Sequence, residues 1–222
     1  MARYPVTPLQ PRKAPVQARS AITVQAICEA TLQVLLNNGG ERLTTTRVAE
    51  RAGVSVGTLY QYYPNKQSLL FAVLDSHMKA VSEAVEAACE RTRGKRMAET
   101  VRAVVEAFVD AKMKRPEVST ALYRIASEVG GPALARRTLQ RSLNALHKAL
   151  KAAPDAGSGP DRFTVQMMFG TMLGTTKSVL DGGASKAKVR NLRRDLLLLC
   201  QSYVTARAGI RRRATSPPRR RA

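Results

Sequence analysis

The sequence predicts an all-α protein of about nine helices, and three features of the chain lead to this fold class. Apolar residues recur at helical spacing along nearly all of the 222 residues, and no segment shows the convincing alternation of a strand. Alanine, leucine and arginine are abundant, which favours helix. Glycine and proline stand where the periodic segments end, as expected for residues that interrupt helices.

Three helices are expected near the N-terminus, over about residues 20–37, 45–52 and 56–62. Thr44 and Ser55 are suitable N-caps for the second and third helices, and Gly53 stands where a left-handed residue is needed. The buried stripe of the first helix is expected to consist of Ile22, Ala26, Ile27, Ala30 and Val34.

Longer helices are expected in the rest of the chain. They are predicted over about residues 66–91, 97–114, 116–129, 132–152, 161–181 and 186–207. Pro116 and Pro132 fall in first turns, where proline is tolerated. The segment APDAGSGP, residues 153–160, is the clearest loop.

The charge of the chain indicates a polyanionic partner. Lysine and arginine number 37 against 16 acidic residues, a net charge of +21, which attracts nucleic acid first and acidic membrane surfaces second. A coding bias toward arginine is the alternative explanation for part of this excess. The segment RRRATSPPRRRA, residues 211–222, is basic, rich in proline and poor in apolar residues, which predicts a disordered tail.

Other classes of protein are disfavoured. Cys28, Cys89 and Cys200 are odd in number and far apart, as are His77 and His147, which speaks against a disulfide scaffold and a metal site. No cofactor is predicted, and a reduced, cytoplasmic compartment is expected. The sequence has no apolar run of about 18 residues, so no membrane span is expected, and residues 1–17 lack the apolar region of a signal peptide. No catalytic constellation is visible, so the chain is not expected to be an enzyme.

The segment GVSVGTLYQYYPNK, residues 53–66, carries the clearest functional signal. Two short helices joined by a glycine-containing turn form a helix-turn-helix pattern, whose second helix lies in the DNA major groove. Small residues at positions 56–58 allow close approach to base edges. Tyr60 and Tyr62 can donate to phosphate oxygens, whereas Leu59 and Tyr63 are assigned to the core. A plain helical corner with packed tyrosines remains the alternative.

Residues 43–70, LTTTRVAERAGVSVGTLYQYYPNKQSLL, resemble the DNA-binding domain of TetR-family transcriptional regulators. The family pattern is A-x-x-x-G-[VIL]-[ST]-x-[GS]-[ST]-[LF]-Y-x-[HY]-F-x-[NS]-K-x-x-L. Tyr63 departs from it, because phenylalanine is usual there. The matching residues are Ala49, Gly53, Val54, Ser55, Gly57, Thr58, Leu59, Tyr60, Tyr62, Asn65, Lys66 and Leu69.

The resemblance implies a homodimeric, all-helical repressor in the bacterial cytoplasm, located on the nucleoid when bound to DNA. A small-molecule inducer would bind its C-terminal domain and release the near-palindromic operator. The implied domains are a disordered basic arm (1–18), a helix-turn-helix domain (19–66), a helical ligand-binding and dimerisation domain (67–208) and a disordered basic tail (209–222). The DNA face carries over to Thr45, Thr46, Arg47, Ser55, Val56, Gly57, Thr58, Tyr60, Gln61, Tyr62 and Lys66.

Within this face the residues have different expected roles. Gln61 is the candidate for reading a base edge, since a carboxamide bonds adenine bidentately, with a solvated glutamine as the alternative. Lys66 is expected to contact phosphate. Arg12, Lys13 and Arg19 either enter the minor groove or touch phosphates, or have no specific role.

The C-terminal part is expected to hold the dimer contact and the ligand. Residues 161–207 are predicted to form the homodimer seam, because QMMFGTMLGTTKSVL and LLLLC present more apolar surface than one core contact needs; buried helices of a monomer are the alternative. Arg136, Arg137, Arg141, Lys148 and Lys151 indicate an anionic ligand or a solvated face. The candidate ligand-lining residues, for which plain core is the alternative, are Phe108, Met113, Tyr123, Met167, Met168 and Met172.

Three functions compete at this stage. The first is a ligand-responsive, sequence-specific repressor. The second is a nonspecific DNA-coating protein, which the net charge of +21 favours; it would bind random DNA nearly as well as its own promoter. The third is a helical small-molecule binder or enzyme with a vestigial helix-turn-helix, and the intact residues 55–66 speak against it.

Overall fold

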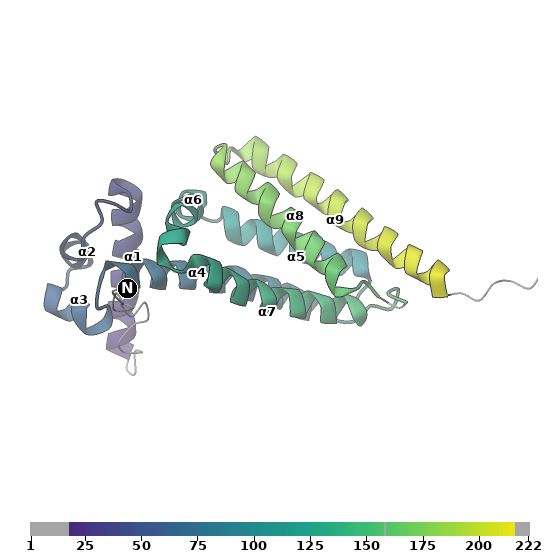
Figure 1. Ribbon diagram of the computed structural model, residues 1–222, viewed down its shortest axis with the longest axis horizontal. Helices are drawn as coiled ribbons and strands as arrows, with labels where there is room; N and C mark the ends of the chain where they lie inside the picture. The colour runs from purple at the N-terminus through teal and green to yellow at the C-terminus, as the bar shows by residue number, and fades with distance from the viewer. Residues whose placement is uncertain (1–17, 158, 216–222) are drawn as a thin grey trace, which may run out of the picture. The chain divides into compact units, whose positions relative to one another are not determined.

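The computed structural model describes residues 18–157 and 159–215, and the regular elements in these ranges are all helical (Figure 1). Nine α-helices and one short 3₁₀ helix are present in this described part of the chain, which confirms the predicted fold class. The chain forms two compact units. Among the described residues, the first comprises residues 18–78 with Glu117–Ala135, and the second comprises Lys79–Pro116 with residues 136–157 and 159–215.

The first unit is a small helical body around one apolar core. It contains α1 (Ala18–Asn38), α2 (Thr45–Ala52), α3 (Val56–Tyr62), the first half of α4 (Lys66–Arg91), most of α6 (Pro116–Ile125) and the 3₁₀ helix η1 (Ala126–Val129). Leu59 and Tyr63, assigned to the core from the sequence, are both buried in it.

The predicted helix ends between α2 and α3 are confirmed. The Thr44 hydroxyl accepts the Arg47 backbone N–H at 3.3 Å, and the Ser55 hydroxyl accepts that of Thr58 at 3.0 Å. Gly53 adopts φ 67° and ψ 30°, and its N–H bonds the last carbonyls of α2. Because a Cβ is disfavoured at positive φ, glycine lets the chain turn sharply from α2 into α3.

The expected buried stripe of α1 was wrong at its first position. Ile22 is 68% exposed, whereas Ile27, Ala30 and Val34 are buried. α1 begins two residues earlier than predicted. Among the described residues, Ile27 is the first residue of α1 that belongs to the apolar core. The first turns of α1 therefore extend beyond the core. Helical spacing predicts that Ile22 lies on the same side of α1 as Ile27 and Ala30, but it does not predict whether the core reaches that far along the helix.

A segment distant in sequence completes the core of the first unit. Val118, Leu122 and Ile125 from α6 pack into the same cluster as α1–α3. A Cβ built on Gly40 would lie only 3.0 Å from Ile125 Cγ2, so the turn before α2 rests closely on α6. Packing groups residues 67–78 and 117–135 with the helix-turn-helix unit, and the functional division at residue 66 stays a prediction.

The second unit is a helical bundle. It contains the second half of α4, α5 (Met97–Met113), α7 (Gly131–Lys151) after its first turn, α8 (Arg162–Asp181) and α9 (Lys186–Thr215). Gln201 Nε2 donates to the Ala98 carbonyl at 2.8 Å, and Arg193 pairs with Asp110 at 2.6 Å. These two contacts lie near opposite ends of α5, so α5 and α9 run antiparallel.

The terminal segments are described only in part. α9 continues to Thr215, so the backbone of residues 209–215 is helical where the sequence predicted a disordered tail. The backbone of Arg19 lies in α1. Arg12 and Lys13, with the rest of residues 1–17, lie outside the described residues, as do residues 158 and 216–222.

Tyrosine is accommodated at the buried position 63 because its hydroxyl has a polar partner in the core. The Tyr63 hydroxyl lies 3.5 Å from Cys28 Sγ on α1, so the hydroxyl has a weak polar partner inside the core. Burial, together with Cys28, raises the pKa of Tyr63, and burial also raises the pKa of Cys28. Both groups are therefore neutral in the folded protein at physiological pH.

This environment predicts a loss of stability in alkali. Unfolded tyrosine ionises near pH 10, whereas folded Tyr63 keeps its proton to higher pH. Above about pH 10 the unfolded state therefore binds fewer protons than the folded state, and the free energy of unfolding falls as pH rises. Tyr63→Phe should remove this contribution. Urea unfolding of both proteins between pH 8 and 11 is the measurement, and parallel curves for the two would contradict the assignment.

Candidate nucleic-acid interface

The exposed surface of α2 and α3 carries most of the residues expected to face DNA. Eleven residues were predicted, and all lie on α2, α3, the turn between them or the first turn of α4. Those exposed to solvent are Thr46, Arg47, Ser55, Val56, Gly57, Tyr60 and Gln61, and those partly buried are Thr45, Thr58, Tyr62 and Lys66.

The hydroxyls of Thr45 and Tyr60 join the two helices on this surface. They lie 3.1 Å apart, although 15 positions separate them in the sequence. Each hydroxyl has one proton, so one donates within the pair and the other remains able to donate outward. The pair thus presents one outward donor and several lone pairs. The sequence had assigned Tyr60 to phosphate by itself, and it carried no signal for the contact with Thr45.

A second hydroxyl pair caps α3. Ser55 Oγ and Thr58 Oγ1 lie 2.8 Å apart, and Ser55 Oγ also accepts the Thr58 backbone N–H. Both side chains are therefore held at the N-terminal end of α3. Val56 and Gly57 lie beside them and are exposed. The side chains at the start of α3 are therefore short, and another molecule can approach the helix backbone closely.

Two basic side chains bond the turn that precedes α2. Lys66 Nζ donates to the Glu41 carbonyl at 3.2 Å, and an Arg47 guanidinium N–H donates to the Arg42 carbonyl at 3.0 Å. Both charges are thereby held beside the same turn. The sequence analysis had identified the two cations but not these carbonyls, because hydrogen bonds to backbone carbonyls leave no residue-type signal.

The position of Lys66 depends on the start of α4. Asn65 Oδ1 accepts the Ser68 backbone N–H at 2.8 Å, and the buried Ser68 hydroxyl donates to the Asn65 carbonyl at 2.7 Å. These bonds cap α4 and fix its first turn. On α2, Arg51 Nε donates to Gln33 Oε1 of α1 at 2.6 Å, a further polar tie that the sequence did not indicate.

Four of the six candidate ligand-lining residues lie in or against one apolar core, and the other two do not. Phe108, Met168 and Met172 are buried in the core of the second unit, where Phe108 meets Phe169 edge-to-face at 6.3 Å. Met113 packs partly buried against that core, and Met167 is 46% exposed. Tyr123 belongs to the first unit. Their role as a ligand site stays a prediction.

The described residues contain no group of three or more His, Cys, Asp or Glu side chains arranged to hold a metal ion. Within the same described ranges, no helix has the length and apolar character required to cross a lipid bilayer.

Comparison with known proteins places both parts of the chain in one family. Residues 27–73 match the model of "Bacterial regulatory proteins, tetR family", and residues 97–203 match "Tetracyclin repressor-like, C-terminal domain". The chain is 31% identical over 98 residues to the HTH-type transcriptional repressor KstR of Rhodococcus jostii, an alignment that covers 44% of each protein. It therefore spans under half the length of this curated relative.

Solved structures share the fold at low sequence identity. A TetR-family transcriptional regulator from Mesorhizobium loti superposes with a TM-score of 0.70 at 17% identity, covering 86% of this chain and 98% of that one. FadR from Bacillus subtilis, in complex with stearoyl-CoA, gives 0.64 at 21% identity, covering 81% and 98%. With the capped helix-turn-helix and the helical bundle described above, the matches to both domain models show that this chain belongs to the TetR family of bacterial regulatory proteins.

Proposed function

We propose that this protein is a dimeric, sequence-specific DNA-binding repressor that a small-molecule ligand releases from its operator. The observation that carries the proposal is the α2–α3 corner, in which caps, hydroxyl pairs and held cations form one exposed, hydrogen-bonding surface. Such a surface suits a duplex, whose backbone accepts hydrogen bonds and whose major groove admits a helix. Membership of a family of bacterial regulatory proteins supports it.

Specificity separates this proposal from a nonspecific DNA-coating protein. Purified protein should select a small set of genomic fragments, and it should bind them about 10³-fold or more tightly than random DNA at physiological salt. Selection followed by competitive gel shifts measures this ratio. A ratio near one would favour the coating protein, and failure to retain any fragment would favour a function without DNA.

The DNA face is proposed to separate positioning from reading. Lys66 and the Thr45–Tyr60 pair would contact phosphates, which fixes the position of α3 without reading the sequence. Gln61 is exposed on α3, the helix proposed to enter the major groove, and its carboxamide suits an adenine edge.

Two substitutions test this division against each other. Lys66→Ala should weaken binding to operator and random DNA alike and lower the salt slope by about one per half-site. Gln61→Ala should cost about 1–3 kcal/mol against one preferred base per half-site and leave the salt slope unchanged. Binding to single-base operator variants at several salt concentrations distinguishes them. An unchanged base preference in Gln61→Ala would refute the reading role. Thermal unfolding of Lys66→Ala shows whether the lost bond to the Glu41 carbonyl has destabilised the fold.

The dimer is proposed to form through α8 and α9. Phe163, Met167, Gly170 and Gly174 share one face of α8 by their spacing, and all four are exposed. A Cβ on either glycine would meet no atom within 4 Å, so this face is uncovered. It lies on the opposite side from Met168 and Met172, which enter the core of the second unit.

α9 presents a matching apolar surface. Leu196 and Cys200 are buried, whereas Leu198 is 66% and Leu199 54% exposed, so α9 is apolar on more than its inner side. A groove of about 310 Å³ lies between α8 and α9 and is lined in part by Leu199. A second copy of the chain would cover these residues, since exposed apolar patches commonly mark such contacts.

Leu198→Asp tests the dimer. In a two-fold interface the substitution removes the same leucine from both copies. Each loss should cost about 1.5–3 kcal/mol of association free energy, so the dissociation constant of the dimer should rise about a hundredfold or more. Sedimentation equilibrium at micromolar concentration is the measurement, and Ala87→Asp on an exposed position of α4 is the control. A monomeric wild-type protein would refute the proposed dimer.

The ligand response is proposed to act through the second unit. The comparison structure of FadR holds stearoyl-CoA, and its helical body matches this chain over both units. α4 would transmit the response, because this one helix supplies Leu70 and Val73 to the first core and Val85 and Ala88 to the second.

A further inference from the structure

A groove lies between the second half of α4 and α7, away from the residues predicted to hold a ligand. Its volume is about 420 Å³, within the range of about 300–1,000 Å³ that small-molecule sites occupy. Both walls belong to the second unit. The lining residues are Glu86, Cys89, Glu90, Arg93, Ala145, Lys148, Ala149 and Ala152.

The floor of the groove is apolar and made of small side chains. Ala145 and Ala149 are four positions apart on α7, so they share one face of that helix, and Ala152 follows directly after the helix ends and forms the exposed rim. Cys89 faces them from α4 and is nearly buried. Burial raises the pKa of the Cys89 thiol to about 12, with a smaller contribution from Glu86. The thiol is therefore neutral and contributes apolar surface.

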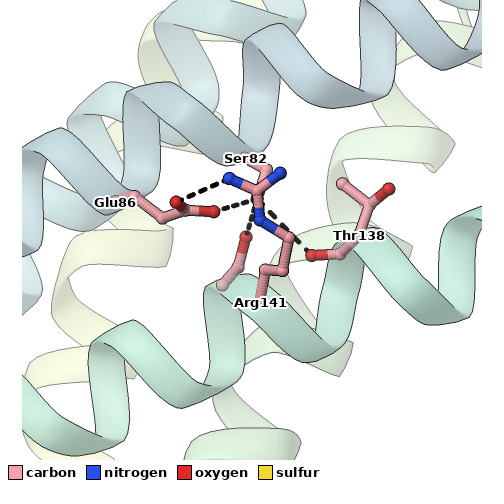
Figure 2. Close-up of polar contacts among 5 residues, drawn as sticks. Ser82, Glu86, Thr138 and Arg141 are labelled. Atoms are coloured by element: carbon pink, nitrogen blue, oxygen red, sulfur yellow. Dashed lines mark hydrogen bonds and ion pairs between the residues drawn. The ribbon is translucent and has the colours of Figure 1, made fainter.

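One carboxylate on the wall is fully engaged by a polar cluster (Figure 2). An Arg141 guanidinium N–H donates to Glu86 Oε2 at 2.9 Å, and the Ser82 hydroxyl donates to Oε1 at 2.7 Å. Ser82 has a single proton, so Ser142, 3.0 Å away, donates to it in turn. This cluster ties α4 to α7 beside the groove, and it leaves Glu86 no charge to offer a cationic ligand.

The remaining charges leave the groove positive. Glu90 on α4 pairs at 2.6 Å with Arg93, two residues beyond the end of that helix, so these two charges compensate each other. Lys148 is exposed on the opposite wall, and the structure gives it no hydrogen bond or ion pair with any other described residue. Lys151 stands one turn further along α7 and is also basic. The charge in the groove that lacks a counter-ion is thus the Lys148 ammonium.

We propose that the α4–α7 groove binds a small apolar molecule carrying one carboxylate. The apolar body would cover the alanine and cysteine floor, and the carboxylate would accept a hydrogen bond from Lys148. The inference rests on the proposed function in that it gives the ligand response a site and a ligand class. A ligand in this position would touch α4 within one turn of its tie to α7.

Binding to the full chain without DNA tests the site. Decanoate, decanol and decylamine, each below its micellar concentration, are titrated calorimetrically. Decanoate should bind about tenfold or more tightly than the other two. Lys148→Ala should weaken decanoate about tenfold, as for the loss of one hydrogen bond to a charged group, and the matched Lys151→Ala should not. Equal binding of all three probes, no binding of decanoate, or an unchanged affinity in Lys148→Ala would overturn the proposal.

A second pair of variants tests the location without removing a charge. Ala152 is exposed, so Ala152→Leu fills the groove from its rim without disturbing the core, and decanoate binding should be lost. Ala87→Leu, exposed on α4 outside the groove, should bind as wild type. Retained binding in Ala152→Leu would place the ligand elsewhere. If decanoate binds in the groove but does not release the protein from its operator, the site proposed here stands and the proposed ligand response is refuted.

Discussion

The continuity of α4 is the constraint on which the rest of the structure depends. Its 26 residues form one helix, and its apolar side chains enter both cores. The same helix thus supplies Leu70 and Val73 to the first core and Val85 and Ala88 to the second. The cap at Asn65 and Ser68 fixes where the helix begins, and with it the position of Lys66 beside the turn before α2.

Polar ties hold α4 to its neighbour where apolar packing is thin. Beyond the Ser82–Glu86–Arg141 cluster, small residues line the groove between α4 and α7, so few side chains interdigitate there. This partly buried cluster bonds both oxygens of Glu86 and links the two helices, so removing one member would leave the carboxylate without one of its partners. The same arrangement keeps a hollow open beside a rigid contact, as a ligand site requires.

The α2–α3 surface shows a related principle on a smaller scale. Its hydroxyls and cations are already bonded to each other or to backbone carbonyls, as in the Thr45–Tyr60 pair and the Lys66–Glu41 contact. Side chains held in this way lose less conformational entropy when they bind than mobile ones do. Binding to DNA would add bonds to the Thr45–Tyr60 pair, which keeps an outward donor, whereas the proposed Lys66–phosphate contact would replace the bond of Lys66 to Glu41.

The sequence by itself determined the local features, because helix ends and amphipathic faces depend on residues three or four positions apart. Thr44, Gly53 and Ser55 were predicted at their caps, and Leu59 and Tyr63 in the core, and all are found there. Tertiary structure alone decided what distant segments do. It left Ile22 exposed and packed α6 into the core of the first unit. It also brought the Tyr63 hydroxyl within 3.5 Å of Cys28 Sγ and the Thr45 hydroxyl within 3.1 Å of that of Tyr60. It further decided that Phe108, Met168 and Met172 share the core of the second unit while Met167 is exposed, since helical spacing defines which face is apolar but not which helix covers it.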